Sequence, residues 1–162
     1  MGQLDSPLTT LGEAQAEALA HRVKTMSISR LYSSDLGRAV QTASCISRTT
    51  GCEVELEKGL RERHMGIFQG LTKSEAETTH PAEWAEYRAK GVEYMIPGGE
   101  SAQQRLERSV KIMTSIADDN HDRDVLVVTH GGFLMGFFEY VLSLIHISEP
   151  TRQEESRMPS SA

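Results

Sequence analysis

The residues of this sequence best suited to chemistry are Arg38, Glu62 and His130, which lie far apart along the chain. An arginine presents a planar fork of N–H donors that fits the oxygens of a phosphate group. A carboxyl group whose pKa is raised by its surroundings can give a proton to a leaving oxygen. A histidine can donate a hydrogen bond to a phosphoryl group while that group is transferred. Together these side chains predict a site for phosphoryl transfer without a metal ion.

Each of these residues also has a structural interpretation when it is taken alone. Arg38 could form a surface salt bridge, Glu62 could be a solvated charge in a loop, and His130 could be a structural histidine before a helix. The hypothesis of one shared site therefore depends on a fold that brings the three side chains together.

Short apolar segments predict the strands that would do so. They cover residues 30–33, 53–56 and 124–129, and the last is an aliphatic run typical of a buried strand in a parallel sheet. Each candidate residue follows one of these strands along the chain. Since the carboxyl ends of parallel strands meet at one edge, where such sheets bind ligands, we expect the candidate side chains to meet there.

Gly131 and Gly132 directly follow His130 and lead into the next predicted helix. Glycine permits a sharp turn, and without a side chain it lets backbone N–H groups at the start of a helix approach an anion closely. The sequence therefore predicts an imidazole and a small anion cradle at the same place.

Helical spacing of apolar residues places helices between and after the strands. The predicted helices run from a capping box at Thr10-x-x-Glu13 to about Met26, from a cap at Ser34 or Asp35 to Gly51, over 73–90 with a break at His80–Pro81, from a cap at Ser101 to about Asn120, and from Phe133 to Leu142. This order predicts an α/β fold, a three-layer α/β/α sandwich with a mainly parallel sheet. Residues 71–99 leave the sheet and return directly to it, so we expect them to form a lid-like helical excursion.

Five segments carry the motifs on which a family resemblance rests; they span residues 2–12, 33–43, 60–66, 97–101 and 127–132. In this order they resemble the motifs of the histidine phosphatase superfamily, also called phosphoglycerate mutase-like, and they cover nearly all of residues 2–142. The resemblance implies that Arg38 is a phosphate ligand, Glu62 the general acid and base, and His130 the second histidine, which hydrogen-bonds the phosphoryl group. The substrate contacts that it implies come from Gly2, Arg38, Arg63, His64 and the backbone N–H of Gly131.

One motif of the family has no counterpart in this sequence. The family's nucleophile is a histidine in an Arg-His-Gly motif at the end of its first strand, and no Arg-His-Gly occurs in the 162 residues. We therefore expect a chain truncated at both ends, without that first strand and without the strands that would follow Leu142. We also expect it to form no phosphohistidine and to have little or no turnover.

For the intact parent, the resemblance implies a phosphomonoesterase that acts through a phosphohistidine intermediate. A mutase must retain a bisphosphate intermediate, and the family's cofactor-dependent mutases carry an arginine pair in a longer insertion. Residues 71–99 offer only Lys73, Arg88 and Lys90, with no adjacent pair, which favours the phosphatase. Phosphoglycerate mutase stays open as an alternative, and so does a non-catalytic phosphate-binding pseudoenzyme.

Composition narrows the choice of partners. The formal net charge of −6 argues against nucleic acid and anionic membranes, and no apolar run reaches the roughly 20 residues of a membrane span. No metal-ligand spacing, P-loop or dinucleotide motif is present, so we expect no metal and no cofactor. The expected partner is a small phosphorylated metabolite; the oligomeric state is left open.

The two ends of the chain differ in character. Residues 1–144 carry the predicted domain, whereas residues 145–162 have no periodicity and are predicted to be a disordered tail, resembling translated adaptor or vector sequence. Only two cysteines occur and no signal peptide opens the chain, so we expect reduced thiols and a cytoplasmic protein.

Overall fold

A parallel sheet lies at the centre of the structure, a computed structural model that describes residues 2–148. Its strands are β1 (Arg30–Ser33), β2 (Val54–Leu56) and β3 (Val125–Val128), in the order β2-β1-β3. Both neighbouring pairs are parallel, so the carboxyl ends of all the strands lie at the same edge. The predicted strands and their common direction are confirmed.

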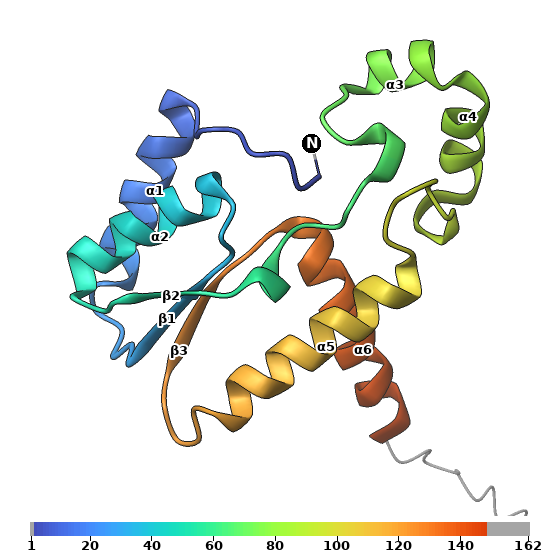
Figure 1. The fold of residues 1–162 in the computed structure, drawn as a ribbon. Helices are drawn as coiled ribbons and strands as arrows, with labels where there is room; N and C mark the ends of the chain where they lie inside the picture. Colours follow the sequence, from blue (N-terminus) through green and yellow to red (C-terminus); the bar gives the residue numbers. More distant parts are fainter. Residues whose placement is uncertain (1, 149–162) are drawn as a thin grey trace, which may run out of the picture.

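Helices cover both faces of this sheet (Figure 1). On one face α1 (Thr10–Val23) packs with α2 (Gly37–Thr50), and on the other α5 (Ala102–Asp118) packs with α6 (Gly131–Ser148). The predicted three-layer α/β/α arrangement is therefore confirmed for the described part of the chain.

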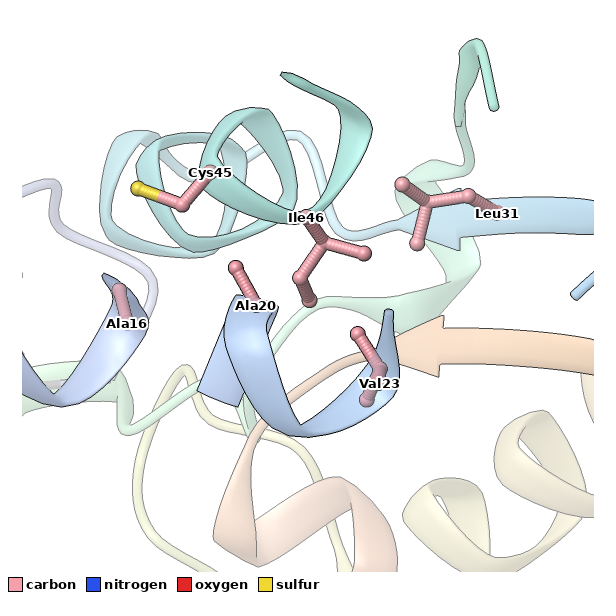
Figure 2. Packing of buried hydrophobic residues seen from close by; sticks show 6 residues of the cluster. All are labelled: Ala16, Ala20, Val23, Leu31, Cys45 and Ile46. Atoms are coloured by element: carbon pink, nitrogen blue, oxygen red, sulfur yellow. The ribbon is translucent and has the colours of Figure 1, made fainter. Parts of the chain in front are cut away.

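Small side chains allow α1 and α2 to pack closely together on the sheet. Figure 2 shows the buried cluster between them, which consists of Ala16, Ala20 and Val23 of α1, Cys45 and Ile46 of α2, and Leu31 of β1. Because side chains alternate along a strand, Leu31 faces this cluster while its neighbour Tyr32 faces the opposite layer. There it packs with Leu60, Ile116 and Phe133.

The helical excursion has an apolar cluster of its own. It comprises α3 (Lys73–Thr79) and α4 (Pro81–Lys90), and the predicted break at His80–Pro81 is confirmed. Proline cannot continue a helix but suits its first turn, which explains why α4 begins there. Trp84 and Tyr87 of α4 pack against the buried ring of Phe68.

Two predicted helix starts are wrong. The hydroxyl of Thr9, not Thr10, caps α1 by accepting from the N–H of Gly12 at 3.1 Å, and no capping box with Glu13 forms. The N-cap of α2 is Leu36, with no side-chain cap, because the polar groups that precede it are bound elsewhere.

Helix α6 also ends later than predicted. Helix α6 continues to Ser148, beyond the predicted ends at Leu142 and at residue 144. The remainder of the predicted tail, residues 149–162, lies outside the described residues. Within residues 2–148, none of the helices combines the length and the apolar character that crossing a bilayer requires.

Candidate functional site

Arg38, Glu62 and His130 all lie at the carboxyl edge of the sheet. Arg38 is in the first turn of α2, which follows β1; Glu62 follows β2 through a short 3₁₀ turn; and His130 directly follows β3. Their charges interact, since the pKa of His130 responds to both Arg38 and Glu62. The structure thus brings the predicted catalytic residues to one place.

His130 is buried, with 8% of its surface exposed. Burial lowers its pKa to about 4 because the charged imidazolium loses hydration, and the nearby Arg38 guanidinium acts in the same direction. The Glu62 carboxylate opposes the shift with a smaller effect. At neutral pH the ring is therefore uncharged, with one nitrogen that donates and one that accepts.

Ser34 is the closest polar partner of this ring. Its Oγ lies 2.9 Å from Nε2 of His130, and both residues are buried. The same Oγ lies 3.4 Å from the backbone N–H of Leu36. The sequence predicts a helix cap at Ser34 or Asp35; instead the hydroxyl of Ser34 faces the candidate site.

Glu62 is held at the start of α6. Its Oε1 accepts from the N–H of Arg63 at 2.7 Å, and its Oε2 accepts from the N–H of Gly132 at 3.1 Å. A Cβ at position 132 would overlap Oε1, so glycine is needed for this close approach. The carboxylate is therefore fixed between its own loop and the helix that follows His130.

Arg38 connects the site to the N-terminal segment. Its guanidinium donates to the carbonyl oxygen of Leu4 at 3.1 Å and to that of Gly2 at 2.9 Å. A guanidinium carries more N–H groups than these bonds use, so Arg38 can also bind an anion. Gly2, a predicted substrate contact, is thus placed beside the predicted phosphate ligand.

The other predicted contacts differ in how they are engaged. Arg63 is 4% exposed and donates to the carbonyl oxygens of Glu100 at 2.9 Å and Tyr94 at 3.2 Å, so it anchors the returning end of the excursion. Burial lowers its pKa. Nδ1 of His64 accepts from Gly66 at 3.2 Å. Gly131 begins α6, with open space where a side chain would be.

The comparisons with known proteins decide the family. The family model described as histidine phosphatase superfamily (branch 1) matches residues 1–153. The chain belongs to this superfamily. The resemblance inferred from the motifs is confirmed.

Relatives in the histidine phosphatase superfamily include both phosphatases and mutase-like proteins. The chain is 38% identical to phosphoglycerate mutase-like protein 4 of Arabidopsis thaliana, over 85% of this chain and 61% of that protein. It is also 38% identical to the metal-independent phosphoserine phosphatase of the same plant, over 85% of this chain and 59% of the relative. The chain therefore spans about 60% of the length of these curated relatives.

A solved structure supports the same assignment. The mycobacterial glucosyl-3-phosphoglycerate phosphatase in complex with VO3 is 32% identical and superposes with a TM-score of 0.77, over 88% of this chain and 72% of that chain. Like this chain, it carries the fold of the superfamily.

Other residues support the candidate site through contacts that the sequence did not indicate. Arg108, on α5, pairs with Glu100 at 2.7 Å and donates to the carbonyl oxygens of Gly59 at 2.6 Å and Arg61 at 2.9 Å. It thereby holds the loop that presents Glu62. Arg61 pairs with Asp35, which lowers the pKa of that carboxyl, and this bridge ties the loop to the start of α2. Arg61 and Asp35 each lie inside one of the motifs, but neither motif indicates that the two residues pair.

The motif at residues 97–101 packs against the loop that contains His64 and Gly66. The N–H of Ile67 donates to the carbonyl oxygen of Pro97 at 3.0 Å, and the N–H of Glu100 donates to that of His64 at 2.9 Å. A Cβ at Gly66 would overlap the backbone of residues 97–99, so the two loops can approach only because this residue is glycine. Within the described part of the chain, no group of histidine, cysteine, aspartate and glutamate side chains could hold a metal ion.

Proposed function

We propose that the full protein to which this chain corresponds is a phosphomonoesterase that works through a phosphohistidine intermediate. The observation that supports it is the meeting of Arg38, Glu62 and His130 at the carboxyl edge of the sheet. In this proposal the Arg38 guanidinium binds the phosphoryl oxygens, neutral His130 donates a hydrogen bond to them, and Glu62 transfers the proton to the leaving oxygen.

The nucleophile of this proposal is not among the 162 residues, which contain no Arg-His-Gly. His130 is a poor substitute, because in this proposal its buried ring lies beside the phosphoryl group as a hydrogen-bond donor and not in line for attack on phosphorus. We therefore propose that residues 1–162 bind phosphate but form no phosphohistidine. Gly2, His64 and the N–H of Gly131 are proposed as further substrate contacts, while the bonds of Arg63 favour a positioning role.

The proposed reaction is hydrolysis rather than mutase chemistry. Retaining a bisphosphate intermediate needs additional cations around the substrate and closure against water. The cations of the excursion, Lys73, Arg88 and Lys90, are all exposed, and Lys90 is paired with Glu86.

The substrate class is a small phosphorylated metabolite, over which residues 71–99 would act as a lid. Cys45 and Cys52 are free thiols, which supports a cytoplasmic location.

Phosphate binding tests the site directly. Titration calorimetry of the 162-residue chain with inorganic phosphate and with vanadate should show binding, and Arg38→Ala should weaken it at least about tenfold, since a charge-assisted hydrogen bond contributes about 1.5–3 kcal/mol. The matched control is Arg88→Ala, because Arg88 is exposed on α4 and distant in sequence from the site. Equal affinities for the two variants would contradict the assignment of Arg38.

Two assays test the remaining parts of the proposal. Incubation of this chain with a labelled phosphate donor should leave no acid-labile covalent phosphate. The full-length protein should hydrolyse small phosphomonoesters faster than it isomerises phosphoglycerate, and preferential mutase turnover would favour the alternative. Binding without hydrolysis in the full-length protein would identify a pseudoenzyme.

A further inference from the structure

A buried arginine, Arg105 of α5, forms an ion pair with Glu139 of α6. Its side chain is 1% exposed, and its Nη2 donates to Oε1 of Glu139 at 2.9 Å and to Oε2 at 2.8 Å. The Nε of Arg105 is also buried and has no hydrogen-bond partner among residues 2–148. Because a buried charge needs a partner to be stable, the Glu139 carboxylate determines where this guanidinium lies.

A glycine on α6 leaves room for the Arg105 side chain. A Cβ at Gly136 would lie only 3.2 Å from Nε of Arg105 and 3.0 Å from Oγ of Ser109. Gly132 is four residues earlier in the helix and Glu139 three residues later, so these positions share one face of α6. That face contacts the candidate site at one end and Arg105 two turns further along.

Arg105 also lies near the loop that carries Glu62. The next residue of that loop, Arg63, is buried, and both its burial and the charge of Arg105 lower its pKa. The carboxylates of Glu100 and Glu139 act in the opposite direction with smaller effects. Two buried guanidinium groups therefore lie close together behind the site, and Glu139 offsets part of their charge from α6.

Helix α5 holds both of the elements that meet at the Glu62 carboxylate. Arg108, three residues after Arg105, donates to the carbonyl oxygens of the loop that leads to Glu62. Arg105 holds α6, which packs along α5 (Figure 1) and whose Gly132 N–H donates to Oε2 of Glu62 at 3.1 Å. The carboxylate is thus fixed between a loop and a helix that neighbouring arginines of α5 hold.

We propose that Arg105 and Glu139 are positioning residues of the phosphate site, because their ion pair sets the place of α6 along α5. The N–H groups of Gly131 and Gly132 move with that helix. The inference rests on the proposed function, since it assumes that phosphate binds at the start of α6. Charged hydrogen bonds fix direction and distance, whereas the apolar contacts between the two helices mainly require that volume be filled.

The test replaces the ion pair with apolar side chains of similar size. Arg105→Met combined with Glu139→Leu should leave the urea midpoint of the 162-residue chain unchanged, since such replacements are often neutral for stability. The amide proton signal of Gly132 should nevertheless move toward its position in Glu62→Ala, in which this hydrogen bond is absent. Inorganic phosphate should bind about two- to tenfold more weakly, the loss expected for one hydrogen bond.

The matched control removes an ion pair between the helices of the other layer. Arg48 of α2 pairs with Glu17 of α1 at 2.6 Å. Arg48→Met combined with Glu17→Leu should leave both the Gly132 signal and the phosphate affinity as they are in the unaltered chain.

Glu139→Asp supplies a second arm, should the double variant fail to fold. It keeps the charge at a position whose side chain is 42% exposed, but it shortens the reach to Arg105 by one methylene group. The Gly132 signal should move in the same direction as in the double variant, by a smaller amount.

The outcomes separate this inference from the proposed function. A Gly132 signal that stays in place in these variants, or a phosphate affinity that is unchanged although the signal moves, would overturn the positioning inference alone. If the unaltered chain binds no phosphate, the proposed function is overturned, and with it the link between the ion pair and the site. The Gly132 signal then still decides whether the pair holds α6.

Discussion

The sheet edge and the helical excursion hold their side chains by different means. At the sheet edge the contacts are polar and join distant parts of the chain, as in the bond between His130 and Ser34 or that between Gly132 and Glu62. In the excursion, a cluster of aromatic and aliphatic side chains from residues 65–96 packs on Phe68. Hydrogen bonds fix direction and distance, whereas apolar packing mainly requires that volume be filled.

This difference suits the proposed reaction. Phosphoryl transfer needs fixed geometry, which the β-strands and the start of α6 provide. The apolar cluster of the excursion includes none of Arg38, Glu62 and His130. The comparison predicts that substitutions in the two regions have separable effects.

The largest expected effect is in the excursion, where Phe68 supports the whole aromatic cluster and is 3% exposed. Phe68→Ala should lower the free energy of unfolding by about 3–5 kcal/mol, because it removes the ring and leaves a cavity. Urea unfolding followed by Trp84 emission and by circular dichroism measures the loss and shows whether the excursion unfolds before the sheet. Phe138→Ala is the matched control, since this ring is 52% exposed and its removal should cost less than about 1 kcal/mol. Equal costs would mean that the cluster contributes little packing energy.

A smaller effect is expected from the sheet edge as the pH falls. Burial lowers the pKa of His130 from 6.5 to about 4, so between these values the unfolded chain binds a proton that the folded chain does not. The stabilising contribution is complete above pH 6.5 and is lost as the pH decreases toward 4, by about 3 kcal/mol in total. Urea unfolding at several pH values measures it.

The variant His130→Asn has no imidazole to titrate, so it isolates this contribution from that of other groups. Its unfolding free energy should fall less steeply than that of the unaltered chain between pH 6.5 and 4. Parallel pH profiles for the two proteins would show that the ring is accessible to protons in the folded state.

The sequence allowed the strands, and the position of the candidate site residues at one sheet edge, to be predicted because both depend on local pattern. The run at 124–129 identifies its own strand, and parallel strands place Arg38, Glu62 and His130 at one edge whatever their distant partners are. The predicted start of a helix was wrong where two neighbouring polar residues could each serve as the N-cap, as with Thr9 and Thr10.

The supporting residues could not be predicted because their roles depend on tertiary contacts. Nothing in the sequence around Arg108 indicates that it binds a loop formed by residues 59–61. The bonds of Arg63 to Glu100 and Tyr94 likewise require the excursion to return to that place. The contact between Ser34 and His130 could likewise be recognised only once β1 and β3 were paired.

Two adjacent glycines test how tightly the sheet edge is packed. Gly132→Ala would place a methyl group against Glu62 Oε1 and disturb the hydrogen bond to Oε2, so it should destabilise the fold by about 2 kcal/mol. Gly131→Ala meets open space in the same helix and should leave the stability unchanged or raise it by up to about 1 kcal/mol. Thermal unfolding of both variants measures the difference, and similar values would show that the Glu62 side chain moves aside easily.

The smallest expected effect concerns Ser34, whose hydroxyl holds the ring of His130. Ser34→Ala removes a buried hydrogen-bond partner and should cost about 1 kcal/mol of stability. Because the ring nitrogen loses its partner, the nitrogen chemical shift of Nε2 should change, and phosphate should bind less tightly since the ring is no longer held toward the anion. Nitrogen-detected NMR of the histidine rings and calorimetry with phosphate measure both effects.

Ser33→Ala is the matched control, because Ser33 is equally buried but its hydroxyl donates to the carbonyl oxygen of Ser34 at 2.9 Å rather than to His130. Its removal should cost a similar amount of stability and leave Nε2 of His130 unchanged. A loss of stability without a change at the ring therefore separates packing at the end of β1 from positioning of the imidazole. If both variants shift the Nε2 signal equally, Ser34 acts through the general packing of this strand end and does not hold the ring itself.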